Sequence, residues 1–189
     1  MKWFERLARW VEHRGGMREL YRPHPVTGQP TLYMRRFYLA KTPFGEAMLH
    51  QFFMGDEGGL HDHPWFSFGR ILAKGYREHL CEKVENGAPV GEFVVERRPG
   101  DWGWRPAGIS TRDNSRGFHR VELRPGEEGQ VWTLFVTGPR KTVWGFLSEN
   151  GWIPFSEYFK KDGTSAKQAT PDQYRGWFFP RKVSKDGCG

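Results

Sequence analysis

The chain has 189 residues and a formal net charge of +7, with nine tryptophans, six tyrosines and fifteen phenylalanines. This length fits one domain with a sizeable core, and the absence of any apolar run of about eighteen residues excludes a membrane-spanning helix. The charged N-terminus lacks the apolar stretch of a secretory signal, and Cys81 and Cys188 lie far apart in the sequence. We therefore expect a reduced, cytoplasmic protein without a disulfide framework.

The excess of basic residues favours either an anionic small molecule or a nucleic acid as partner. Basic pairs are spread along the chain, for example at 35–36, 97–98 and 160–161, rather than gathered in one dense block. The sequence has neither a helix-turn-helix signature nor zinc-finger spacing. A solvated basic surface is the simpler interpretation, so nucleic-acid binding is the less favoured alternative.

Residues 1–16 are predicted to form an N-terminal amphipathic helix. Apolar side chains recur at helical spacing, and Gly15 and Gly16 end the pattern. We expect this apolar stripe to dock onto the main domain. Its members are Trp3, Phe4, Leu7, Trp10 and Val11.

Residues 30–160 are predicted to form one β-rich domain. From residue 30 the pattern takes the period of two that is typical of strands, and Gly- and Pro-rich turns separate short runs. Several short strands with regular turns favour a sandwich or a barrel, closed by a short helix or strand at 152–159. Residues 161–189 are predicted to be a partly disordered tail. The strand candidates are 32–40, 47–54, 67–80, 92–96, 117–123, 131–136 and 142–147.

The strongest chemical signal is the pair His61 and His63. Side chains at i and i+2 of a strand share one face, so these two imidazoles can bind one metal ion. Imidazole suits zinc, copper, iron and nickel. Asp62 alternates away from the pair and is interpreted as a residue that orients the loop. The histidines at 13, 24, 50 and 79 are interpreted as surface or packing residues.

The surrounding residues resemble the first motif of the cupin superfamily. That motif consists of Gly, five residues, His-x-His, three or four residues, Glu, six residues and Gly. Gly55, His61, His63 and Gly75 match it in register, whereas Phe68 stands at the glutamate position. The resemblance therefore implies a metal site that lacks one of the usual ligands.

A second match, less complete, follows later in the chain. The second cupin motif consists of Gly, five residues, Pro-x-Gly, two residues and His, and Gly100, Pro106 and Gly108 fit its first half. The histidine position is held by Thr111, and the next histidine, His119, begins a strand-like run. We predict that His119 is the third metal ligand, after an insertion between the two.

The resemblance implies an all-β fold, the cupin double-stranded β-helix or jelly-roll barrel, with the N-terminal α-helix added outside. It also implies one divalent transition metal on His61, His63 and His119, with Fe(II) favoured and Zn or Ni possible. Similar three-histidine iron centres belong to thiol and aromatic-ring dioxygenases, so an Fe(II) dioxygenase acting on a small anionic molecule is the leading hypothesis. Because cupins commonly pair, a homodimer is expected, with the aromatic stripe of the N-terminal helix as candidate interface.

The remaining candidate site residues were assigned around this centre. An aromatic wall that includes Phe68 and Trp104, or Trp102, would keep the pocket dry, and a basic residue would anchor an acidic substrate. The candidate anchors are Arg70 and Arg120, and the candidate catalytic side chains are Glu78 and Tyr76.

Three other functions stay open at this point. A cupin fold hosts many chemistries, so the fold does not choose among them. The same histidines could hold Zn or Ni for Lewis-acid hydrolysis, isomerisation or lyase chemistry. The chain could also be a metal-free isomerase with a histidine base, or a non-catalytic cupin that binds a small ligand.

Overall fold

The structure is a computed structural model that describes residues 1–24, 27–56, 58–108 and 117–161. Apart from Lys161, the predicted tail at 161–189 lies outside the described residues, as does the insertion at 109–116. Within the described residues, no helix is long and apolar enough to cross a membrane.

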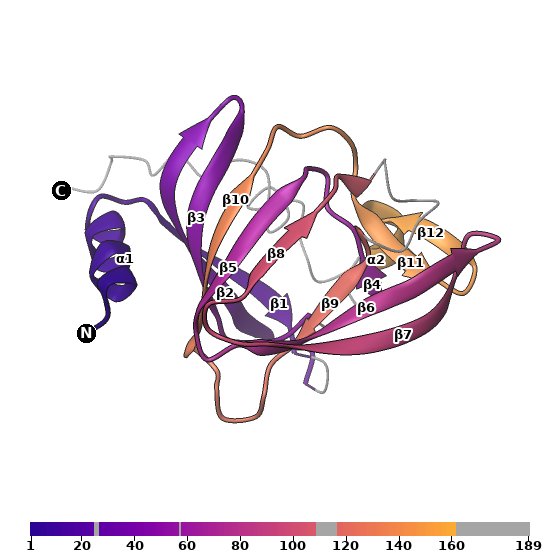
Figure 1. The fold of residues 1–189 in the computed structure, drawn as a ribbon, viewed down its shortest axis with the longest axis horizontal. Helices are drawn as coiled ribbons and strands as arrows, with labels where there is room; N and C mark the ends of the chain where they lie inside the picture. The colour runs from indigo at the N-terminus through magenta and orange to yellow at the C-terminus, as the bar shows by residue number, and fades with distance from the viewer. Residues whose placement is uncertain (25–26, 57, 109–116, 162–189) are drawn as a thin grey trace.

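Two curled antiparallel sheets form the body of the molecule (Figure 1). The first sheet has the strand order β1-β2-β3-β10-β5-β8. Strand β10 lies between β3 and β5, so segments distant in the sequence become neighbours, as in a jelly roll. The strands span Met17–Pro23 (β1), Pro30–Thr42 (β2), Gly45–Phe52 (β3), Val131–Thr137 (β10), Ser67–Ala73 (β5) and Trp102–Arg105 (β8).

The second sheet has the strand order β12-β11-β4-β9-β6-β7. Its strand β4 lies next to β9, which places the His-x-His segment beside the strand that begins at His119. Helix α2, Phe155–Lys161, follows the last strand. The strands span Gly151–Pro154 (β12), Gly145–Ser148 (β11), Leu60–His61 (β4), His119–Glu122 (β9), Tyr76–Glu85 (β6) and Ala88–Arg97 (β7).

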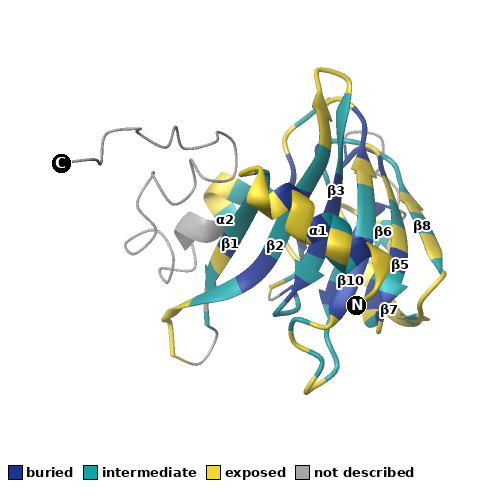
Figure 2. Ribbon diagram, turned by 90° about the vertical axis from the view of Figure 1, so that its left-hand side faces the viewer, coloured by how far each residue is buried: buried dark blue, intermediate teal, exposed yellow. Residues whose placement is uncertain are grey.

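The all-β fold with an N-terminal helix, predicted from the sequence, is confirmed. Helix α1, Trp3–His13, lies across the outer face of the first sheet (Figure 2). Phe4, Ala8 and Val11 are buried there in one cluster with side chains of β2, β3, β5 and β10. Trp3 and Trp10 remain 60% and 53% exposed. Only part of the predicted stripe therefore docks.

The strand candidate at 67–80 is in fact two strands. Lys74 and Gly75 separate β5 from β6, and both have a positive φ, which at Gly75 is 119°. A Cβ at Gly75 would also lie 2.0 Å from the carbonyl oxygen of Arg97. Glycine is required here because a side chain would meet a backbone atom that cannot rotate away. Strands β1, β4 and β8 were not predicted, and β1 extends the first sheet ahead of residue 30.

The inner face of the first sheet carries a row of polar side chains. Arg36 on β2 is paired with His50 on β3, and His50 is paired with Thr133 on β10. Residues directly opposed in neighbouring strands project on the same side, with Cβ atoms about 4.5–5.5 Å apart. This row therefore faces the second sheet across the interior of the barrel.

Candidate metal centre

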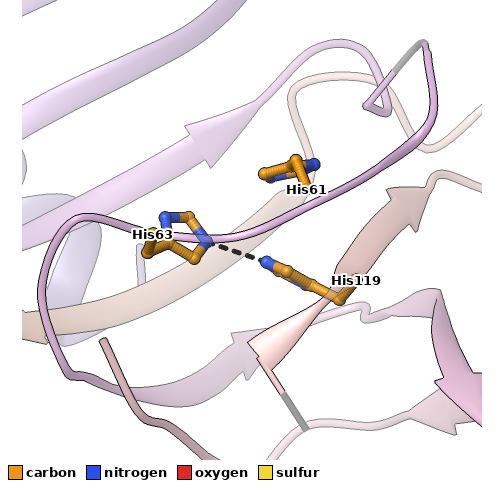
Figure 3. A group of neighbouring side chains, drawn as sticks. All are labelled: His61, His63 and His119. Carbon is orange, nitrogen blue, oxygen red and sulfur yellow. Dashed lines mark hydrogen bonds between the residues drawn. The ribbon is translucent and has the colours of Figure 1, made fainter. Parts of the chain in front are cut away.

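Three histidines meet between the two sheets (Figure 3). His61 ends β4, His119 begins β9, and the two are direct register partners. His63 lies on the loop just after β4. The ring centroid of His119 lies 4.9 Å from that of His61 and 5.1 Å from that of His63. The structure thus brings together the three side chains that the sequence predicts as ligands.

The spacing of these histidines fits one transition-metal ion. One ligand nitrogen from each residue lies within 4.8 Å of the others, and the two Nε2 atoms of His63 and His119 are 2.8 Å apart. Two nitrogens bound to one tetrahedral or octahedral ion, with bonds of about 2.0–2.1 Å, lie roughly 2.8–3.4 Å apart. Small side-chain rotations therefore suffice for all three histidines to bind the same ion.

All three imidazoles are held in the neutral form, which is the form that binds metal. Burial lowers the pKa of His61, and the neighbouring Asp56 opposes this effect. Burial, followed by the neighbouring charges, lowers the pKa of His63 and His119 well below the usual value. Arg105 is among these charges for both residues.

Glu78 orients His119. Its Oε1 lies 3.0 Å from Nδ1 of His119, while Arg97 and Arg105 bind the same carboxylate. A carboxylate paired with two guanidinium groups is ionised and only accepts hydrogen bonds, so His119 carries its proton on Nδ1. The lone pair of its Nε2 then points toward His63. Such carboxylate–histidine pairs fix the tautomer of metal ligands.

Two buried aspartates hold the segment that carries the His-x-His pair. Asp56 accepts hydrogen bonds from the Tyr33 hydroxyl at 2.5 Å and from the Val121 amide at 2.9 Å, which ties the segment to β9. Asp62 accepts bonds from the Gly145 amide at 2.7 Å and from Nε1 of Trp152 at 3.1 Å. Asp62 therefore points away from the pair and fixes the loop, as strand alternation predicts.

A cavity of about 100 Å³ adjoins the histidines. Apolar side chains from both sheets form much of its lining, among them Phe52, Ile71 and Phe135. The charged lining residues comprise four arginines, Arg36, Arg70, Arg97 and Arg105, and three acids, Asp56, Glu78 and Asp101. The protein side chains alone thus give the lining an excess of one positive charge, and a bound divalent ion would add two more.

Four of the candidate residues from the sequence line this cavity, namely Tyr76, Glu78, Arg70 and Trp102. Tyr76 is one of them, and burial raises the pKa of its phenol, which therefore stays protonated. Glu78 also lines the cavity, is 1% exposed and contacts Nδ1 of His119. Arg70 is exposed, and its guanidinium lies over the ring of Trp102 at 4.7 Å.

The structure does not bring Phe68, Trp104 or Arg120 to the cavity. Phe68 and Trp104 are register partners and are 39% and 60% exposed. They project from the opposite face to their neighbours Ser67 and Arg105, which line the cavity. Arg120 follows the inward-pointing His119 and faces outward, where it binds Glu92 at 2.8 Å. Strand alternation is the physical reason in each case.

Other cavity residues were not identified from the sequence. Arg97 and Arg105 lie on β7 and β8, and their convergence on Glu78 depends on strand register that the sequence does not display. Arg36 and His50 were missed because His50 was interpreted as a packing residue. The alternation that places Arg36 two residues after the buried Met34 was a usable signal.

No family model matches the sequence, and no curated protein matches it. Solved structures do resemble the fold. A cupin 2 conserved barrel domain protein from Rhodopseudomonas palustris is 13% identical, with 81% of this chain and 90% of that chain covered and a TM-score of 0.48. An uncharacterised double-stranded β-helix protein from Klebsiella pneumoniae is 16% identical, with 73% and 94% covered and a TM-score of 0.43. KdgF from Halomonas is 21% identical, with 57% and 82% covered and a TM-score of 0.37.

The assignment of the fold rests on this chain itself. Its two curled sheets interleave distant strands, and its first motif places Gly55, His61, His63 and Gly75 in cupin register. The third histidine arrives from β9, on the strand that pairs with the His-x-His segment. The fold is a double-stranded β-helix, the jelly-roll barrel that the resemblance to cupins implies.

Proposed function

We propose that this protein is a metal-dependent enzyme in which His61, His63 and His119 hold one divalent ion beside the cavity. The observation that carries the proposal is the convergence of three neutral imidazoles within 4.8 Å. Three neutral ligands leave the charge of the ion uncompensated and leave coordination positions open. A site that is only structural is normally closed by four protein ligands.

Within this class we favour Fe(II) and a dioxygenase-type oxidation of a small substrate. Proton-transfer chemistry needs a base with a pKa near the working pH. Among the titratable groups of the cavity, Tyr76 is protonated and Glu78 is bound by two arginines. The carboxylates of Asp56 and Asp101 both accept backbone hydrogen bonds, from the amides of Val121 and Arg98. His50 is neutral, but burial and the charge of Arg36 lower its pKa well below the usual value, so it is a weak base. Redox chemistry at a metal requires no such group.

The side chains have separate tasks in this proposal. The three histidines bind the ion, and Glu78 keeps the Nε2 lone pair of His119 directed toward it. Phe52, Ile71 and Phe135 exclude water from the substrate. Fe(II), when bound, supplies the electron-transfer chemistry that lets O₂ react with a closed-shell organic molecule. A dioxygenase places both oxygen atoms in the product, so no external reductant is needed.

The first experiment is elemental analysis of purified and reconstituted protein. We expect about one transition-metal ion per chain in the wild type and almost none in His119→Ala. The matched control is His79→Ala, which removes a buried histidine on the outer side of the second sheet, bound to Glu92 and Glu122. This control should keep its metal. Full metal occupancy in His119→Ala would refute the three-histidine assignment.

The second experiment separates the reaction types. Protein loaded with Fe(II), Zn(II) or Ni(II) is screened for oxygen uptake with small thiols and with aromatic acids. Consumption of O₂ by the Fe(II) form alone supports the oxidation. Tight metal binding without oxygen uptake for any substrate would contradict it and would favour a binding protein or Lewis-acid chemistry.

A further inference from the structure

Three residues that line the cavity each have a buried polar atom without a hydrogen-bond partner among the described residues. The atoms are Nε of Arg36, Nε2 of His50 and Nε1 of Trp65. His50 is only 4% exposed. Buried polar atoms are almost always hydrogen-bonded in native proteins, because an unmet bond costs about 1–3 kcal/mol. Three such atoms around one cavity need partners that the described side chains do not supply, and a ligand or ordered water in the cavity would supply them.

The chemistry of these atoms indicates an anion. Nε of Arg36 and Nε1 of Trp65 are obligate donors. Arg36 has no ion pair with any described carboxylate, whereas Arg97 and Arg105, which line the same cavity, share Glu78. The only other cavity-lining arginine without a described ion pair, Arg70, is exposed. Arg36 is thus a positive charge with a buried N–H that the protein leaves unmet.

The position of these residues relative to the metal centre limits the ligand. Arg36 on β2 and His50 on β3 are directly opposed. The metal-ligand candidate His63 is also near His50, because its charge and that of Arg36 both lower the pKa of His50. A cavity of about 100 Å³ is small. Its size admits only a small molecule.

We infer that Arg36, His50 and Trp65 form a subsite for the carboxylate of a small carboxylic acid, whose other end reaches the three-histidine centre. A carboxylate has two oxygens with about four acceptor positions, which match the guanidinium edge, the indole N–H and the imidazole. Such a ligand also supplies a counter-charge for the guanidinium of Arg36, which pairs with no described carboxylate. The contact between the other end of the ligand and the metal rests on the proposed function. Binding of the carboxylate by Arg36, His50 and Trp65 does not require the ion.

The test is calorimetric titration with propionate, compared with propanol and inorganic phosphate, on Zn(II)-loaded and on metal-stripped protein. Propionate is expected to bind the wild type, propanol is not, and phosphate is expected to bind more weakly. Arg36→Gln should weaken propionate binding about 10- to 100-fold, the range for one charged hydrogen-bonding group. Trp65→Phe, which removes only the N–H donor, should weaken it about 3- to 10-fold.

Two controls carry the same charge change as Arg36→Gln. Arg120→Gln removes an outward-facing guanidinium and should leave propionate affinity unchanged. Arg70→Gln tests the exposed arginine of the same cavity. Loss of affinity in Arg70→Gln with full affinity in Arg36→Gln would overturn the inference. So would equal binding of propanol, or no binding of propionate to the wild type.

The outcome for the subsite can be separated from that for the metal centre. Metal content is measured in the same samples, and thermal melting confirms that each variant is folded. Arg36-dependent propionate binding by a protein that retains no metal would support the subsite and refute the metalloenzyme. Bound metal with propionate affinity that does not respond to Arg36→Gln would refute the subsite alone.

Discussion

Nδ1 of His119 lies 3.0 Å from Oε1 of Glu78, a carboxylate that is 1% exposed and is also bound by Arg97 and Arg105. In the first cupin motif a glutamate follows the His-x-His pair, and in this chain Phe68 occupies that position and faces outward. A carboxylate is nevertheless present at the centre. This carboxylate, Glu78, comes from β6 and forms a hydrogen bond with His119, one of the three proposed metal ligands. The glutamate of the cupin motif, by contrast, binds the metal directly.

Glu78→Gln is expected to reduce zinc affinity about 10- to 100-fold, the usual effect of losing a carboxylate that orients a metal-binding histidine. The same change leaves the half-buried guanidinium groups of Arg97 and Arg105 without their buried counter-charge. The free energy of unfolding should fall by about 3 kcal/mol, the low end of the range for breaking a buried ion pair. Competition with a chromophoric chelator measures the affinity, and urea unfolding measures the stability.

The matched control for Glu78 is Glu92→Gln. Glu92 contacts Nδ1 of His79 at 2.6 Å, so it forms the same kind of carboxylate–histidine pair outside the centre. Zinc affinity should be unchanged in this variant. A folded Glu78→Gln protein with wild-type zinc affinity would show that His119 does not depend on this contact.

Metal-stripped protein is expected to lose stability as the pH falls below about 6.5. Burial lowers the pKa of His50, His61, His63 and His119 from a usual value of 6.5, so these residues stay neutral in the folded state at a pH where the unfolded chain binds protons. Stability is therefore complete above pH 6.5 and falls as the pH decreases toward the lowered folded values. Four such groups give a limiting slope of about 5 kcal/mol per pH unit.

Urea unfolding of the metal-stripped protein at pH 7.5, 6.5 and 5.5 measures this slope. His50→Phe should reduce it by about 1.4 kcal/mol per pH unit, which corresponds to one proton. A free energy of unfolding that stays constant between pH 7.5 and 5.5 would mean that these histidines bind protons equally in the folded and unfolded states, so that folding does not lower their pKa.

The parts of the fold that could be predicted are those encoded by local pattern. The period-two runs, the His-x-His pair and the turn glycines gave the barrel and two of the three ligands. His119 could be assigned because it begins a strand whose inward positions are apolar, as Val121 is. None of these inferences required knowledge of which strands are neighbours.

The remaining errors and omissions have two physical causes. Phe68, Trp104 and Arg120 were chosen for their chemistry, although alternation from His119 places Arg120 on the outer face. Alternation could not place Phe68, because a loop separates His63 from the start of β5 at Ser67. In β8 the large aromatic Trp104 is exposed while the small Gly103 lines the cavity, so residue type alone does not predict which side chain faces inward. The contacts of Glu78 with Arg97 and Arg105 join three strands, and only the tertiary register reveals them.

Gly75→Ala is expected to destabilise the protein strongly. The φ of Gly75 is 119°, which costs an alanine about 1–3 kcal/mol, and its Cβ would lie 2.0 Å from the backbone oxygen of Arg97. Relief of that overlap would move β7 against β6, on which Glu78 lies. Urea unfolding should show a loss above about 3 kcal/mol, and metal affinity should fall as well.

Gly103→Ala provides the comparison for Gly75, because a Cβ at Gly103 meets nothing within 4 Å. This variant should unfold within about 1 kcal/mol of the wild type. If Gly75→Ala and Gly103→Ala lowered the free energy of unfolding by similar amounts, the close approach of Gly75 to Arg97 would not be the cause of the destabilisation.

Phe4→Ala is expected to lower the free energy of unfolding by about 3–5 kcal/mol, the usual cost of removing a buried phenylalanine. Phe4 is 3% exposed and packs on Trp132 of β10, with ring centroids 5.4 Å apart. Helix α1 covers the outer face of the sheet whose inner face carries Arg36 and His50. Loss of this contact should therefore also weaken ligand binding in the cavity, which propionate titration would detect.

Trp10→Ala separates the docked side of α1 from its exposed side. Trp10 is 53% exposed, and its one described ring contact is with the guanidinium of Arg14, whose centre lies 4.2 Å from the ring centroid. An exposed cation–π contact contributes about 0.5–1 kcal/mol, so this variant should be only slightly less stable than the wild type. If Trp10→Ala instead destabilised the protein as much as Phe4→Ala, Trp10 would have to be covered in solution. Size-exclusion chromatography would then show whether a second copy of the chain covers it, since a homodimer through α1 would dissociate when this side chain is removed.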